Sequence, residues 1–196
     1  RMRSAPFLLP PDLLSERLDA LRRASSGRLD AHLRELAAIN RLHALAAIRA
    51  ARHGWIGASF SIAELCTVLY FDPAFNVCVG PDRVPLVALG KGHAAAMQYA
   101  CLAARGVMPP EDLLRYKTPD GPQAHADIVT PGVPFNTGSL GQALSKCCGM
   151  AFGGAEPITC IVGDGELQEG QCFEALQTLA HRNLTSVLPV VDCNGI

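Results

Sequence analysis

The sequence predicts an α/β fold, a three-layer α/β/α arrangement around a mainly parallel sheet. Short apolar runs rich in β-branched residues alternate with longer stretches whose apolar residues recur at three-and-four spacing, which is typical of helices. Glycine-rich turns follow two of the short runs, as they do in strand–turn–helix units. With 196 residues, of which 49% are hydrophobic and 18% charged, the chain is long enough for one full hydrophobic core.

Helices and strands are expected to alternate along most of the chain. The apolar periodicity predicts helices over residues 13–23, 29–52, 94–105, 109–116 and 169–181, and one within 137–154. Strands are expected over residues 84–89, 157–162 and 186–191. The segment Ser61-Ile62-Ala63-Glu64 matches a capping box, which predicts that another helix begins there and continues to about Tyr70. The long Pro- and Gly-containing loop over residues 118–135 is predicted to belong to a functional site, because long irregular segments in compact domains usually do.

The chain is interpreted as two parts. Residues 1–28 form an N-terminal arm or helix, and residues 29–196 form the main domain. The sequence ends at Asn194-Gly195-Ile196, directly after a hydrophobic run. We expect the domain to be truncated at this point or to continue as a disordered segment beyond residue 196.

Composition and charge argue against several classes of function. Residues 1–52 hold ten arginines against five acidic residues, but these alternate as on a solvated helix and lack aromatic stacking partners, so nucleic-acid binding is not expected. No run of about 18 uncharged apolar residues is present to span a bilayer, so no membrane partner is expected. The eight cysteines lack the Cys-x2-Cys spacing of zinc sites and lie mostly in apolar runs, which indicates reduced thiols and a cytoplasmic protein.

The residues that most clearly indicate chemistry follow the last two predicted strands. Gly163-Asp164-Gly165 comes directly after one strand, and Asn194 follows the next. Because the carboxyl ends of neighbouring parallel strands share one crevice, Asp164 and Asn194 are expected to face the same point. A carboxylate and an amide oxygen suit a hard cation such as Mg²⁺, especially where ligand phosphates complete its coordination. Neither a dinucleotide fingerprint nor a P-loop is present, since Gln168 and Gly92 stand where those motifs need other residues.

The histidines divide into two groups. His93 and His125 lie in turns on the expected ligand side, where a neutral imidazole near pH 7 can both accept and donate a proton. We therefore expect these two residues to be functional. The histidines in helical stretches, His32, His43 and His181, are expected to be solvated.

Five short segments, taken in their order along the chain, give a further indication of the protein's class. They are residues 52–61 (Arg-His-Gly-Trp-Ile-Gly-Ala-Ser-Phe-Ser), 89–95 (Leu-Gly-Lys-Gly-His-Ala-Ala), 123–127 (Gln-Ala-His-Ala-Asp), 137–142 (Thr-Gly-Ser-Leu-Gly-Gln), and Gly163-Asp164-Gly165 with Asn194 thirty residues after the aspartate. The last segment resembles the thiamine diphosphate motif, and the five together resemble the N-terminal part of transketolases. The resemblance covers roughly residues 36–196 and implies the thiamine diphosphate-binding fold.

The resemblance implies roles for particular residues around thiamine diphosphate. Asp164, Asn194 and the backbone carbonyl of Ile196 would bind Mg²⁺, or Ca²⁺ or Mn²⁺ in its place, and the ion would neutralise the diphosphate. The other cofactor-binding residues that it implies are His93, Gly138, Ser139, Leu140, Gly163, Gly165 and Glu166. His93 would also lie near the reacting centre, and His125 would face the substrate oxygen that changes protonation. Glu169 would belong to a hydrogen-bonded link between paired sites at a subunit interface.

The resemblance further implies an enzyme that acts only with a partner. The family's cofactor is activated by a glutamate from a second, pyrimidine-binding domain, which does not occur in these 196 residues. We therefore expect the diphosphate-binding subunit of a split transketolase-like enzyme, which transfers a two-carbon ketol unit from a ketose or ketose phosphate to an acceptor. Its partner would be a transketolase C-terminal-type subunit, and the assembly would be a dimer of heterodimers.

One departure from the family keeps other functions open. Trp55, the only tryptophan, stands where most transketolases have a histidine that contacts substrate and cofactor, and an indole cannot exchange protons in its place. One alternative is a dehydrogenase or acyl-forming component that passes the two-carbon unit to a carrier thiol. Another is a non-catalytic scaffold subunit that has kept the fold.

Overall fold

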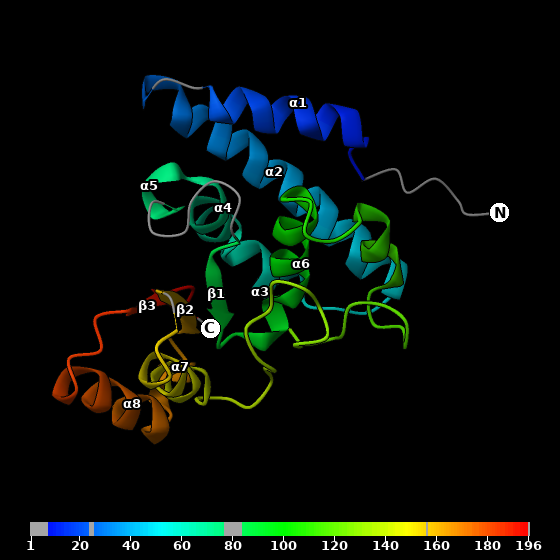
Figure 1. Ribbon diagram of the computed structural model, residues 1–196. Coiled ribbons are helices and arrows are strands. Elements are labelled where there is room, and N and C mark those ends of the chain that lie inside the picture. Colours follow the sequence, from blue (N-terminus) through cyan, green and yellow to red (C-terminus); the bar gives the residue numbers. More distant parts are fainter. Residues whose placement is uncertain (1–7, 24–25, 77–83, 156, 196) are drawn as a thin grey trace.

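The first half of the chain is a block of helices. The structure, a computed structural model, describes residues 8–23, 26–76, 84–155 and 157–195. The block consists of α1 (Pro11–Arg22), α2 (Ser26–Ala51), α3 (Ile56–Ser61), α4 (Ala63–Phe71) and the short α5 (Pro73–Asn76). Figure 1 shows α1 alongside α2, the longest helix. The periodicity predicted α1 and α2, whereas α3 was not predicted because Gly54 and Gly57 interrupt the helical pattern.

Three parallel strands form a sheet in the order β1–β2–β3. They are β1 (Leu86–Leu89), β2 (Ile158–Gly163) and β3 (Val187–Asp192). The remaining elements are the 3-10 turns η1 (Gly92–Ala94), η2 (Pro110–Arg115) and η3 (Glu166–Gln168), and the helices α6 (Ala95–Ala104), α7 (Ala143–Phe152) and α8 (Gly170–His181). Gly163 pairs with Asp192, so β2 and β3 end level with each other. The three strands lie where the sequence predicted them, within about two residues at either end.

Helices cover both faces of the sheet (Figure 1). Because side chains alternate along a strand, Val87 and Leu89 of β1 pack in the core with α2, α4 and α6, while Ala88 packs in the core with α7 and α8. On β2, Ile161 belongs to the first core and Cys160 to the second. Helix α6, all ten of whose residues are buried, lies at the centre of the larger layer. The predicted three-layer α/β/α fold is confirmed.

The described residues bear on two expectations, the absence of a membrane-spanning segment and the presence of reduced cysteines. In these ranges, no helix combines the length and the apolar character needed to cross a membrane. The seven cysteines that the structure describes are free thiols, six of them buried, and Cys78 lies outside the described residues. Burial raises the pKa of a thiol such as that of Cys101, which keeps it neutral and lets it pack as a small apolar side chain. The division of the chain between residues 28 and 29 stays a prediction.

The capping box predicted at Ser61 is wrong. Ser61 is the last residue of α3, and Ile62 precedes α4 without a side-chain cap. The Ser61 hydroxyl lies instead 2.8 Å from the carboxylate of Asp192, and Glu64 forms an ion pair with Arg41 on α2. The local pattern failed because both side chains have partners that are distant in the sequence.

His43 is buried, although the sequence predicted a solvated side chain. Its side chain on α2 is 0% exposed, and its Nε2 accepts a hydrogen bond from the backbone N–H of Leu9 (3.1 Å). Burial lowers the pKa of His43 to about 4, because the charged imidazolium would lose its hydration there. Helical spacing could not reveal this burial, since Leu9 lies 34 positions away along the chain. His181 is exposed, as expected, and His32 is partly exposed.

We predict that His43 makes the stability of the fold depend on pH. Because its pKa is lower in the folded state than in the unfolded chain, the unfolded chain takes up a proton first, and stability falls as the pH drops from about 6.5 to about 4. The loss is about 3 kcal/mol in the free energy of unfolding. Urea unfolding near pH 7 and near pH 4.5 measures it. The variant His43→Gln keeps an acceptor for Leu9 but does not titrate, so an equal pH dependence in both proteins would contradict the prediction.

Candidate functional site

The carboxyl ends of the three strands lead into turns that line one pocket. Gly90 and Lys91 follow β1, Asp164 and Gly165 follow β2, and Asn194 lies two residues beyond β3. All five residues line a pocket of about 290 Å³. Parallel strands bring their carboxyl ends to the same edge of the sheet, where open α/β sheets bind their ligands. The predicted convergence of Asp164 and Asn194 is therefore present in the fold.

Backbone hydrogen bonds hold the Asp164 carboxylate in place. The N–H of Gly165 donates to its Oδ1 (3.0 Å), and the N–H of Gly195 donates to its Oδ2 (3.1 Å). Each carboxylate oxygen has a further lone pair that can bind a cation. The Asn194 side chain donates from Nδ2 to Asp192 Oδ2 (3.1 Å), so its amide oxygen is the end turned away from Asp192. Asp164 and Asn194 thus bring oxygen ligands to the same pocket.

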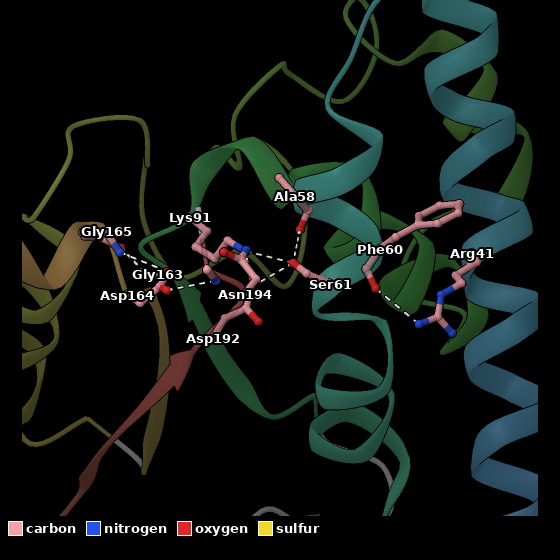
Figure 2. A network of polar contacts seen from close by, with 12 residues as sticks. Arg41, Ala58, Phe60, Ser61, Lys91, Gly163, Asp164, Gly165, Asp192 and Asn194 are labelled. Carbon is pink, nitrogen blue, oxygen red and sulfur yellow. Dashed lines mark hydrogen bonds and ion pairs between the residues drawn. The ribbon is translucent and has the colours of Figure 1, made fainter.

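A largely buried ion pair between Lys91 and Asp192 links the ends of β1 and β3 (Figure 2). The two side chains are only 11% and 12% exposed. Ser61 on α3 completes the network, with its hydroxyl 2.9 Å from Lys91 Nζ. Burial alone would raise the pKa of Asp192, but the hydrogen bonds from Lys91 and Ser61 outweigh burial and lower it. Asp192 is therefore charged near neutral pH, and its carboxylate orients the Asn194 amide.

The buried carboxylate of Glu166 holds the end of β2 and the turn at Gly141 against the pocket. It is 4% exposed, and its oxygens accept hydrogen bonds from the N–H groups of Gly141 (3.0 Å) and Gly163 (3.3 Å). Burial raises the pKa of Glu166, and these two hydrogen bonds partly offset the effect. A Cβ on Gly90 would collide with this carboxylate, so glycine at position 90 leaves room for Glu166. Glu166 lines the pocket and also supports the turns around it.

His93 and His125 lie side by side in the pocket, with ring centroids 5.2 Å apart. His93 belongs to η1, and His125 lies in the long irregular loop, where its carbonyl oxygen accepts a hydrogen bond from Tyr99 Oη (3.1 Å). A Cβ on Gly92 would lie 2.8 Å from the His125 ring, so glycine leaves room for the imidazole. Burial lowers the pKa of His125, and the neighbouring His93 and Lys117 lower it further. His125 is therefore neutral at pH 7 and able to accept a proton.

Trp55 packs against both of these histidines. The centroid of its indole lies 4.4 Å from the ring of His93 and 5.4 Å from that of His125. His53 meets the indole edge-on at 5.7 Å. Trp55 therefore forms an aromatic wall beside the two pocket histidines, at the position where the sequence departs from the family pattern.

Most of the predicted site residues line the pocket. They are His93, His125, Gly138, Leu140, Gly163, Asp164, Gly165, Glu166 and Asn194. Ser139 is exposed in the same turn as Leu140 but is not a lining residue, and Glu169 is exposed at the start of α8. Ile196 lies outside the described residues. The chemical roles assigned to these residues stay predictions.

Lys91, which lines the pocket, and its partner Asp192 are charged residues of the site that the sequence did not identify. Each follows or ends a strand at its carboxyl end, and Lys91 stands in the segment 89–95, so a signal was present. Their pairing depends on strand order, because β1 and β3 lie on opposite sides of β2 and their side chains meet beyond the strand ends. Sequence spacing does not contain this information.

The fold and the pocket define a parallel α/β domain whose ligand site, rich in glycine and oxygen ligands, lies at the carboxyl ends of its strands. Comparison with known families makes this assignment specific. Residues 33–196 match the family model of the transketolase thiamine diphosphate binding domain. The chain belongs to the transketolase family.

Its relatives include longer transketolase-like proteins and the separate subunits of two-component transketolases. The chain is 34% identical over 178 residues to transketolase-like protein 2 of Homo sapiens, which covers 84% of this chain and 28% of that protein. It is 36% identical over 156 residues to one subunit of the apulose-4-phosphate transketolase of Actinobacillus succinogenes. The match covers 73% of this chain and 55% of that subunit. It is 37% identical over 153 residues to one subunit, SqwG, of the 6-deoxy-6-sulfo-D-fructose transketolase of a Clostridium species, which covers 72% and 54%. The chain thus spans between 28% and 55% of the length of these relatives.

Solved structures agree with the family assignment. The transketolase of Campylobacter jejuni matches with a TM-score of 0.74 at 25% identity, over 84% of this chain and 28% of that chain. The transketolase of Leishmania mexicana matches with a TM-score of 0.67 at 26% identity, over 81% and 27%. The three-layer fold described above is therefore the fold of this part of transketolases.

The residues at the pocket fit thiamine diphosphate together with a divalent ion. Asp164 and Asn194 supply a carboxylate and an amide oxygen, which are the hard ligands that Mg²⁺ prefers. Within the described ranges, no group of three or more His, Cys, Asp or Glu side chains is arranged to hold a metal by itself. A metal at Asp164 and Asn194 would therefore need further oxygen ligands, which a diphosphate provides. The glycines in the pocket wall let such a group approach the backbone closely.

We predict that Lys91 and Asp192 stabilise the fold as a coupled pair. Removing one partner of a largely buried ion pair leaves the other charge unpaired, so Lys91→Met and Asp192→Asn should each lower the free energy of unfolding by about 3 kcal/mol. The double variant should lose less than the sum of the two. Urea unfolding of the four proteins measures the coupling. Strictly additive losses would show that the two side chains do not act together.

Proposed function

We propose that this chain is the diphosphate-binding component of a two-component transketolase-like enzyme. The reaction transfers a two-carbon ketol unit from a ketose or ketose phosphate donor to an acceptor. The observation that carries the proposal is the meeting of Asp164 and Asn194 with His93 and His125 in one pocket. Two relatives that are named as transketolase subunits support the two-component form. Membership of the transketolase family supports ketol transfer over an acyl-forming component or a scaffold.

The metal end of the pocket binds the diphosphate. The side-chain oxygens of Asp164 and Asn194 hold Mg²⁺, for which Ca²⁺ or Mn²⁺ can substitute. The turn at residues 138–140 and the glycines after β2 contact the cofactor. When bound, thiamine diphosphate supplies the electron sink needed to break a carbon–carbon bond next to a carbonyl group.

The end of the pocket that holds the two histidines transfers protons. His125, neutral because its pKa is lowered, accepts the proton of a substrate hydroxyl and returns it when the acceptor reacts. His93, whose ring lies 5.2 Å away, contacts the substrate and cofactor from the neighbouring turn. The indole of Trp55 packs against the His93 ring on this side. Glu169, exposed at the start of α8, forms the link between paired sites.

A partner subunit completes the working enzyme. The pyrimidine-binding domain comes from a transketolase C-terminal-type subunit, and the two subunits assemble as a dimer of heterodimers in the cytoplasm. The names of the two relatives, which describe them as subunits, support the existence of such a partner. Sites built between subunits favour a symmetric assembly.

We predict that Asp164 is essential for metal-dependent cofactor binding. Asp164→Ala removes the only carboxylate expected to contact the ion, so the affinity for thiamine diphosphate in the presence of Mg²⁺ should fall by more than about tenfold. Calorimetric titration of the chain together with its partner measures the affinity. Asp120→Ala, which removes an exposed carboxylate outside the pocket, is the matched control and should leave it unchanged. Unchanged affinity in Asp164→Ala would refute the assignment, and no saturable heat in the wild type would favour a scaffold.

A further inference from the structure

Lys117, His53 and Trp55 form a group of side chains that adjoins the pocket. Lys117 Nζ lies 4.0 Å from the centroid of the Trp55 ring and 2.7 Å from Nδ1 of His53. The same indole packs against His93 and His125, which line the pocket. Lys117 and His53 are therefore separated from the pocket histidines by a single side chain.

An uncommon backbone conformation holds Lys117 at this place. Its φ is 63°, in the left-handed region that residues other than glycine rarely adopt. The Lys117 N–H donates to the carbonyl oxygen of Pro122 (2.8 Å), which closes the turn. Such conformations persist only where the surrounding structure enforces them, and they cluster at functional sites. The conformation therefore indicates a constraint on where the Lys117 side chain lies.

The Lys117 ammonium brings a positive charge to this group. In the part of the chain that the structure describes, Lys117 forms no ion pair, whereas Arg115, two residues earlier, pairs with Asp112. A lysine ammonium can only donate hydrogen bonds, so Nδ1 of His53 accepts one and the proton of a neutral His53 resides on Nε2. Partial burial lowers the pKa of Lys117, so its charge is stabilised less than that of a fully exposed lysine. A bound anion would restore that stabilisation.

We propose that Lys117 and His53, beside the indole of Trp55, bind the terminal oxyanion of the substrate. This oxyanion is a phosphate, sulfonate or carboxylate group remote from the carbon that reacts. The inference rests on the proposed function, because that function places the reacting end of the substrate at His93 and His125. The Lys117 ammonium supplies charge-assisted hydrogen bonds, and the His53 imidazole supplies another donor. The indole forms an apolar wall between the two ends, so it limits the length and shape of the substrate that spans them.

The fluorescence of Trp55 reports on this site, because the chain has no other tryptophan. The full chain is titrated with glycerol 3-phosphate at constant ionic strength, with thiamine diphosphate and Mg²⁺ present to fill the diphosphate-binding end. Glycerol is the uncharged counterpart. A saturable change in Trp55 fluorescence is expected with glycerol 3-phosphate, and no change is expected with glycerol. 2,3-Dihydroxypropane-1-sulfonate and 3,4-dihydroxybutanoate carry a sulfonate and a carboxylate on the same three-carbon diol unit, so they rank the three oxyanions.

Two matched variants test the contribution of Lys117. Lys117→Met keeps an unbranched stem but removes the charge, so the dissociation constant for glycerol 3-phosphate should rise by about tenfold or more. Arg115→Met removes one positive charge nearby and should leave the dissociation constant unchanged. Circular dichroism checks that both variants fold. Equal affinity in wild type and Lys117→Met, an equal response to glycerol, or no saturable binding by either fluorescence or calorimetry would overturn the proposal.

The failure of this proposal can be told apart from the failure of the proposed function. Cofactor binding is measured in the same samples. If thiamine diphosphate binds but glycerol 3-phosphate binding does not depend on Lys117, only the oxyanion site is wrong. If thiamine diphosphate does not bind even when the partner subunit is added, while glycerol 3-phosphate binds through Lys117, the oxyanion site stands and the proposed function is wrong.

Discussion

The parallel alignment of three strands is the constraint on which the rest of the site depends. Because β1, β2 and β3 run in the same direction, the turns that follow them meet at one edge of the sheet. Three side chains then connect these turns. The Lys91–Asp192 ion pair joins the first and third strands, and the buried Glu166 carboxylate binds the turn after the second strand and the turn at Gly141. The pocket wall is thereby held in place by the folded chain itself.

The two ends of the pocket differ in chemistry, and this difference organises the proposed function. Oxygen ligands gather at Asp164 and Asn194, whereas titratable bases gather at His93 and His125. A metal-bound diphosphate suits the first end, and proton exchange with a substrate suits the second. Trp55 extends the second end as an aromatic wall. The departure from the family pattern that the sequence indicated therefore lies at this end of the pocket.

The fold and most of the pocket could be predicted from the sequence because both have local signals. Apolar periodicity located the strands and most helices, and residues such as Asp164 and Asn194 stand at strand ends, where topology alone brings them together. Features that depend on distant contacts could not be predicted. The hydroxyl of Ser61 lies 2.8 Å from the carboxylate of Asp192, 131 positions away, so the capping box predicted from the local pattern was wrong. The burial of His43 likewise depends on a distant residue, Leu9. The chain spans at most 55% of the relatives named above, so the activity of a whole enzyme goes beyond what this fold alone defines.

The central claim is that Asp164 and Asn194 together hold the ion that binds the diphosphate. A crystal of the chain grown with thiamine diphosphate and Mn²⁺, which scatters anomalously, tests it most directly. The account predicts one anomalous peak within coordination distance of the Asp164 carboxylate and the Asn194 amide oxygen, next to the diphosphate. An anomalous peak elsewhere in the protein, or a cofactor whose diphosphate lies away from these two side chains, would contradict it.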